Sequence, residues 1–208
     1  PNLRETVTLT TAGALFATVV MLLQAVWNGA RPSLDLVQVT PGLEIAFRIE
    51  PLGMLFATIA STLWIINSIY SIGYMRSLNE HAQTRFFAAF AVSLSAAVGG
   101  AFAANLFTLV IFYELLSLVT YPLVYHKENS ESWAGSRRYI VYLVGASKSF
   151  LLAGLALTYH LAGTLDFMPH GLLSGVDASG ALLGVVYLCY LAGFAKAAVM
   201  PFHAWLPA

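Results

Sequence analysis

Residues 106–125 read LFTLVIFYELLSLVTYPLVY, an apolar run that contains a single charged residue, Glu114. A helix needs about 20 apolar residues, at about 1.5 Å each, to cross the ~30 Å hydrocarbon core of a bilayer. Similar runs occur elsewhere in the chain, at about residues 6–27, 51–75, 86–104, 138–161 and 181–200. The sequence therefore predicts an all-α integral membrane protein, a six-helix bundle forming a single transmembrane domain over residues 1–208.

The composition leads to the same class of protein. Of 208 residues, 59% are hydrophobic and 10% are charged, whereas soluble domains average about 45–50% apolar and about 25% charged residues. These values exclude a soluble enzyme and a disordered chain. A net charge of zero provides no basic field for nucleic acid, and one cysteine, Cys189, excludes a disulfide framework. The first run lacks a basic leader and a cleavage site, so we do not interpret it as a signal peptide.

The segment between the first two predicted helices has a different periodicity. Over residues 37–49 the apolar side chains fall on odd positions, and Pro41-Gly42 interrupts the alternation. A period of two is typical of a strand, and Pro-Gly is a favourable turn pair. We therefore expect a β-hairpin over about residues 36–50, lying on the membrane surface with one apolar and one polar face. An irregular loop with chance alternation is the alternative.

The loop cations predict an orientation, because cytoplasmic loops carry an excess of Lys and Arg. With alternating helices, one side of the membrane holds only Arg31 and Arg48. The other side holds six cations: Arg4, Arg76, Arg85, Lys127, Arg137 and Arg138. The sequence therefore predicts a multi-pass protein of the cell (inner) membrane, with the start of the chain and the 76–85 and 126–137 loops in the cytoplasm.

Glu114, Lys148 and Lys196 are the ionisable residues within predicted spans. Each costs roughly 2.5–3.5 kcal/mol at a helix centre, so such residues usually serve a function or are paired. By helical rise, Glu114 and Lys148 lie near the midplane, and Ser117 continues a polar stripe from Glu114. We favour a proton relay through these groups. A static buried ion pair remains the alternative, and Lys196 could instead extend to the interface.

Pro201 predicts a break in the sixth helix, because proline leaves the carbonyl of Ala197 without its helical donor. Broken helices carry ion sites in transporters, and Lys196 and His203 flank this break. A helix that simply ends at the interface would also explain Pro201. No metal site is predicted.

Two stretches resemble the antiporter-like subunits of respiratory complex I, membrane-bound hydrogenases and Mrp-type Na⁺/H⁺ antiporters. They are the FYELL run of residues 112–116 and the residues from Gly193-Phe194-Ala195-Lys196 to PFHAWLP at 201–207. The first stretch, continued through TYPLV at 120–124, looks most like the D-type subunit of Mrp antiporters.

The resemblance implies a fold of about fourteen helices with two inverted five-helix repeats, each containing a broken helix. This chain looks like an N-terminal portion of it. It also implies that Glu114 and Lys196 form a charged pair gating a proton half-channel, with His203 as a secondary group. Lys148 departs from this pattern, because it lies in a helix where relatives carry variable charges, and its role as a modulator or as a second relay group is left open.

These features predict a proton-translocating membrane subunit of a multi-subunit ion pump or cation/proton antiporter. The expected partners are other membrane subunits, protons and the bilayer, with Na⁺ exchange left open. We expect no cofactor and no catalytic site in this chain, so redox chemistry would come from partner subunits. Haem is disfavoured because every histidine falls in a loop or at a helix end: His81, His126, His160, His170 and His203. A structural subunit whose buried ion pair only holds helices together is the alternative.

Overall fold

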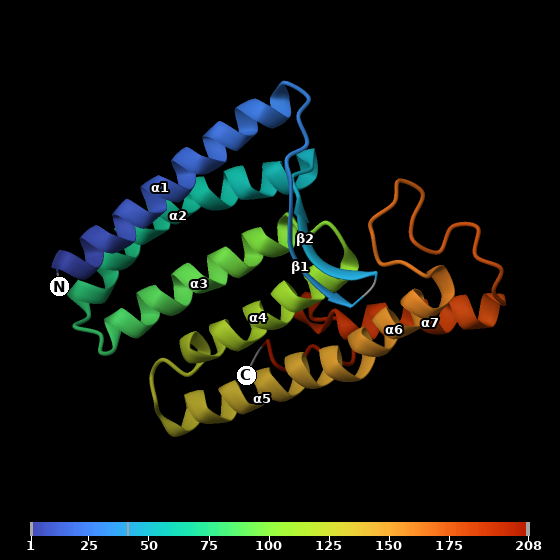
Figure 1. The fold of residues 1–208 in the computed structure, drawn as a ribbon. Coiled ribbons are helices and arrows are strands. Elements are labelled where there is room, and N and C mark those ends of the chain that lie inside the picture. The colour runs from blue at the N-terminus through green and yellow to red at the C-terminus, as the bar shows by residue number, and fades with distance from the viewer. Residues whose placement is uncertain (1, 41, 207–208) are drawn as a thin grey trace.

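The computed structural model describes residues 2–40 and 42–206, which form helices and one hairpin (Figure 1). The α-helices of the first half are α1 (Asn2–Trp27), α2 (Pro51–Ser77), α3 (Gln83–Ala101) and α4 (Leu106–Val124). Those of the second half are α5 (Ser130–Ala146), α6 (Leu152–Ala162) and α7 (Gly180–Gly193). A π-helical turn, η1 (Ser147–Leu151), joins α5 to α6, and a 3₁₀ turn, η2 (Ala195–Ala197), follows α7. The strands are β1 (Ser33–Thr40) and β2 (Leu43–Arg48).

Five helical segments of the described chain are long and apolar enough to cross a membrane. Four of them are α1 to α4, and the fifth runs continuously over Ser130–Ala162 through the π turn. The first four begin and end within about four residues of the predicted spans, whereas the fifth begins at Ser130, ahead of the predicted residue 138. The sixth span differs from the prediction, because α7 has 14 residues and ends at Gly193. The expectation that this helix continues to about residue 200 was wrong.

Successive helices run in opposite directions, and their connections gather at two ends of the bundle (Figure 1). The start of α1, the α2–α3 connection and the α4–α5 connection lie at one end. Charged side chains join the first two of these segments: the buried carboxylate of Glu5 accepts hydrogen bonds from Arg76 and Arg4, and Arg4 also donates to Gln83. The three cation-bearing segments of the predicted orientation therefore share one end of the molecule.

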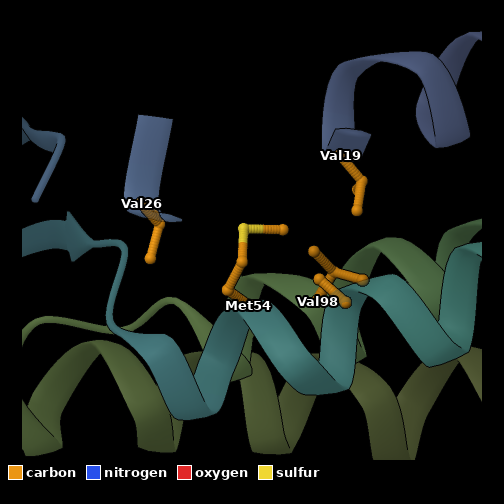
Figure 2. Packing of buried hydrophobic residues seen from close by; sticks show 5 residues of the cluster. Val19, Val26, Met54 and Val98 are labelled. Atoms are coloured by element: carbon orange, nitrogen blue, oxygen red, sulfur yellow. The ribbon is translucent and has the colours of Figure 1, made fainter. Parts of the chain in front are cut away.

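The helices α1, α2 and α3 share an apolar core (Figure 2). It contains Val19 and Val26 of α1, Met54 and Ala57 of α2, and Val98 of α3. Between helices that lie in lipid, the attraction comes mainly from the close packing of such side chains, because lipid removes most of the hydrophobic effect that acts in water. Many large apolar side chains outside this core are exposed, as expected for surfaces that face lipid or other protein.

The β-hairpin is present between α1 and α2, as predicted, and its two strands are antiparallel. Gly42 has the positive φ of 83° that the turn requires, while Pro41 lies outside the described residues. The expected two-faced burial is absent from the described part of β1, because every residue of that strand is exposed.

Instead, the hairpin is held along its other strand. Backbone amides of Arg48 and Ala104 donate to the carbonyls of Phe102 and Ala46, at 2.8 and 2.9 Å. These bonds fix β2 to the junction between α3 and α4.

Asn105 explains where α4 begins. Its side chain accepts a hydrogen bond from the Thr108 amide at 2.8 Å, which satisfies one of the free N–H groups at the helix start. It also donates to the carbonyl of Glu44 in β2 at 3.0 Å. The hydroxyl of Thr108 accepts from the Ala46 amide at 3.1 Å. The hairpin and the start of α4 therefore form one hydrogen-bonded unit.

Candidate functional site

Glu114 lies near the middle of α4, which packs against α3 on one side and α5 on the other. Its carboxylate oxygen Oε1 is buried and has no hydrogen-bond partner among the described residues. A buried polar atom without a partner is costly and uncommon in native proteins. Such an oxygen is available to a proton, an ion or a movable cation.

The segment that faces this part of α4 is the end of α7. The helix stops at Gly193, where the backbone comes very close to the π turn: a Cβ added at Gly193 would lie 2.7 Å from the amide nitrogen of Leu151. Leu151 is itself fully buried. Only a residue without a side chain permits this approach, so Gly193 fixes the place where α7 meets η1.

Lys196 lies in the 3₁₀ turn just beyond α7 and rests on Tyr113 of α4. Its Nζ donates to the Tyr113 carbonyl at 2.5 Å and lies 4.0 Å from the centre of the Tyr113 ring. Its backbone amide donates to the Tyr113 hydroxyl at 3.1 Å. One tyrosine therefore binds both the ammonium group and the unwound backbone, and it does so next to Glu114.

The unwound backbone has a second side-chain partner in Trp205. The indole Nε1 donates to the carbonyl of Ala195 at 3.1 Å, and the ring packs edge-on against Tyr139 of α5, with centroids 5.6 Å apart. Backbone groups that leave a helix at membrane depth must find other partners. Tyr113 and Trp205 supply these partners here, so specific side-chain hydrogen bonds stabilise the break.

A stripe of hydroxyl groups continues from this point along α4. Ser117 is fully buried and donates to the Tyr113 carbonyl at 3.1 Å. One turn further, the Thr120 hydroxyl lies 2.5 Å from the Tyr139 hydroxyl of α5. These hydroxyl groups connect the Lys196 side of α4 to α5.

The structure brings some of the predicted site residues together and separates others. Lys196 lies at the α7 break beside the Tyr113–Glu114 stretch of α4, but no ion pair within the described chain joins it to Glu114. Lys148 lies in the π turn with its side chain exposed, and no described ion pair includes it. His203 is exposed in the turn that follows Pro201. The helix ends before Pro201 is reached, so the break predicted at Pro201 begins earlier, at Gly193.

Tyr113 is the site residue that sequence reasoning missed. It stands in the same run as Glu114, but a search for ionisable groups in apolar segments passes over a neutral phenol. A signal was available, because tyrosine buried in an apolar helix usually finds a partner for its hydroxyl group.

These features define a multi-pass membrane protein in which α4 carries a carboxylate with one buried oxygen, beside a lysine-bearing helix break. Residues 103–208 match the family model described as "NADH:quinone oxidoreductase/Mrp antiporter, TM". Residues 39–87 match the model for the N-terminus of chain 5 of NADH-ubiquinone oxidoreductase (complex I). The first match covers more than half of the chain, and the protein therefore belongs to the NADH:quinone oxidoreductase/Mrp antiporter family of membrane subunits.

Curated relatives come from both branches of this family. The chain is 29% identical over 210 residues to the chloroplastic NAD(P)H-quinone oxidoreductase subunit 5 of Zygnema circumcarinatum, covering 94% of this chain and 29% of that one. It is 30% identical over 172 residues to the A-type subunit of the Na(+)/H(+) antiporter of Alkalihalophilus pseudofirmus, covering 80% of this chain and 21% of that one. The chain thus spans less than a third of the length of these relatives. The more specific resemblance to the D-type subunit of Mrp antiporters stays a prediction.

Two solved structures share the fold. A chain of the Mrp complex from a Dietzia species superposes with a TM-score of 0.75 at 24% identity, over 99% of this chain and 38% of that one. A chain of the archaeal membrane-bound sulfane sulfur reductase superposes with a TM-score of 0.81 at 22% identity, over 98% of this chain and 41% of that one. At these identities the likeness establishes the antiporter-like fold.

Proposed function

We propose that this chain is a proton-translocating subunit of a multi-subunit ion pump or cation/proton antiporter, and that Glu114 and Lys196 carry the proton-transfer step. The observation that supports this most strongly is the contact of Lys196 with Tyr113. The ammonium group rests on a carbonyl oxygen and an aromatic ring, one residue away from a carboxylate with a free buried oxygen.

This arrangement suits a proton relay better than a fixed ion pair. A carbonyl holds a lysine less firmly than a carboxylate would, because the attraction is to a dipole and not to a full charge. Lys196 can therefore move toward Glu114 or lose its proton without breaking a buried salt bridge. Lysine is suited to this role because its protonation responds to burial and to neighbouring charges.

The structural alternative is that these groups only hold α4 and the α7 break together. Transport by the intact protein in proteoliposomes distinguishes the two roles. If Glu114 is a relay group, Glu114→Gln inserts and folds normally but no longer moves protons. Glu131→Gln, at an exposed acidic position in the first turn of α5, is the matched control and keeps wild-type transport. A Glu114→Gln variant that transports normally would overturn the relay.

Lys196→Arg tests the lysine separately, because arginine keeps the charge but does not release its proton at physiological pH. We expect transport to be lost in this variant and retained in Lys127→Arg, an exposed control. Unchanged transport in Lys196→Arg would remove Lys196 as a proton carrier and leave it as a cation that holds the break.

The membrane setting and partners are part of the same proposal. We infer that the chain assembles with other membrane subunits, and that the end of the bundle carrying the α2–α3 and α4–α5 connections faces the cytoplasm. Single cysteines at Asn79 and Asp166, in a background with Cys189 replaced by serine, test the orientation through labelling by an impermeant maleimide. Labelling of the Asp166 position, but not of the Asn79 position, in spheroplasts is expected. Repeating transport with a Na⁺ gradient decides between proton movement alone and Na⁺/H⁺ exchange.

A further inference from the structure

A second cluster of ionisable side chains lies far from Lys196, where the α2–α3 connection meets the end of α4. The carboxylate oxygen Oε2 of Glu80 lies 3.7 Å from His81 Nδ1 and 3.7 Å from His126 Nε2. The two imidazole rings stack with centroids 5.0 Å apart. Three potential ligand atoms, one from each residue, all lie within 4.8 Å of one another.

Ordinary hydrogen bonding does not account for this cluster. A separation of 3.7 Å is too long for a hydrogen bond between a carboxylate and an imidazole. Both ring nitrogens of His126 are buried and have no hydrogen-bond partner among the described residues. Three polar side chains from two separate segments thus converge without satisfying one another, although the cost of burying such groups favours pairing.

The neighbouring cation Arg85 does not pair with Glu80 among the described residues. Arg85 is itself engaged, because it forms an ion pair with Glu128 and donates to the His126 carbonyl at 3.2 Å. Glu80 therefore has no Lys or Arg partner within the described chain, and the two imidazole rings are the ionisable groups that lie against its carboxylate.

We propose that Glu80, His81 and His126 form a binding site for a divalent transition-metal ion, with Zn²⁺ as the best match. Two imidazole nitrogens and one carboxylate oxygen are a ligand set that Zn²⁺ uses when it keeps an open fourth position. Zinc bonds of about 2.0–2.2 Å in a tetrahedral arrangement place ligand atoms roughly 3.3–3.5 Å apart. The observed 3.7 Å from the Glu80 oxygen to each imidazole nitrogen is close to this spacing.

Such an ion would tie the α2–α3 connection to the end of α4. Glu80 and His81 lie between two residues with left-handed backbone, Asn79 and Ala82, so the connection is a tight turn that presents both side chains together. His126 lies about 18 Å from Glu114 along the chain direction of α4, at ~1.5 Å per residue. The metal site is therefore separate from the Lys196 site but acts on the helix that carries Glu114.

Zinc titration of the intact, detergent-solubilised protein tests the proposal. After chelator treatment and removal of the chelator, ZnCl₂ is added in competition with a fluorescent zinc indicator. We expect one ion per chain, with affinity reduced by at least about tenfold in His81→Ala and in His126→Ala. His160→Ala and His170→Ala, exposed histidines outside the cluster, are matched controls and bind as the wild type does. Zinc binding that is absent, or equally weakened by the control variants, would overturn the site.

Cobalt provides a second measurement that does not depend on a folded variant. Co²⁺ bound to two nitrogens and one oxygen in a four-coordinate site gives intense visible absorption, whereas surface-bound Co²⁺ in water does not. We expect this absorption on adding CoCl₂ to the wild-type protein and its displacement by one equivalent of ZnCl₂. A spectrum of hydrated cobalt only would refute the proposal even if the histidine variants failed to fold.

Discussion

Replacing Gly193 by alanine is the sharpest test of how the α7 break is positioned. The added Cβ would lie 2.7 Å from both Cβ and the amide nitrogen of Leu151, and 2.8 Å from its Cα. Two of these three atoms belong to the backbone of the π turn, and Leu151 is fully buried. The contact cannot be relieved by rotating a flexible side chain, so α7 and η1 must separate.

The size of the effect follows from the geometry. Restoring an ordinary contact of about 3.4 Å requires a shift of roughly 0.7 Å between two packed backbones, and overpacking of this kind costs about 1–3 kcal/mol. Alanine recovers up to about 1 kcal/mol through its higher helix propensity. With that recovery subtracted, we expect Gly193→Ala to lower the free energy of unfolding by up to about 2 kcal/mol.

Gly184 provides the matched control within the same helix. A Cβ added there meets nothing within 4 Å, so Gly184→Ala should stabilise α7 by about 0.5–1 kcal/mol through propensity alone. The measurement is unfolding of the intact protein in mixed micelles of a mild detergent and SDS, followed by circular dichroism. Transport should also fall in Gly193→Ala, because the shift displaces Lys196 from Tyr113.

The two variants have opposite expected signs, and this makes the result easy to interpret. If Gly193→Ala were as stable as Gly184→Ala, the close approach of α7 to the π turn would be wrong. If Gly193→Ala were destabilised but kept normal transport activity, contacts other than those at Gly193 would position the break.

Three further variants test other parts of the site. Tyr113→Phe removes the acceptor of the Lys196 amide and should cost about 1–3 kcal/mol in the same unfolding assay; a negligible change would mean that this hydrogen bond is not formed. Asn105→Ala removes the cap of α4 and its bond to β2, so a loss of about 1–2 kcal/mol is expected, and an undisturbed α4 would contradict the role given to the hairpin. Lys148→Ala should shift the pH dependence of transport without abolishing it, whereas a silent variant would assign Lys148 to structure alone.

Most of the fold was predictable because the bilayer constrains it so strongly. A run of apolar residues long enough to cross the membrane has few alternatives to a helix, and α1 to α4 begin and end near the predicted limits. The hairpin followed from alternation and from a Pro-Gly pair. The early end of α7 was not predictable, because residues 194–200 are apolar apart from Lys196 and contain neither Gly nor Pro. Their conformation depends on Leu151, Tyr113 and Trp205, which lie outside that stretch of sequence.

The site was predictable in its charges but not in its contacts. Ionisable residues in apolar runs stand out by their cost, which pointed to Glu114, Lys148 and Lys196. The depth of Lys148 in the membrane could be estimated from its position along the helix. The side of the helix on which it lies could not be predicted from the sequence. The π turn at Ser147–Leu151 inserts extra backbone and changes the rotation of the residues around it, leaving Ser147 buried and Lys148 exposed.

The hydrogen bonds at Tyr113 bear on how Lys196 could move. If its ammonium group shifted from the Tyr113 carbonyl to the free oxygen of Glu114, that carbonyl would keep a donor in the Ser117 hydroxyl. The Lys196 amide would keep its bond to the Tyr113 hydroxyl, so the backbone of the break need not rearrange. The move would exchange one buried acceptor for another and leave no polar group unpaired, which keeps its cost low. A purely structural role would not require Lys196 to bind a carbonyl next to a free carboxylate oxygen, since a direct salt bridge to Glu114 would hold the helices equally well.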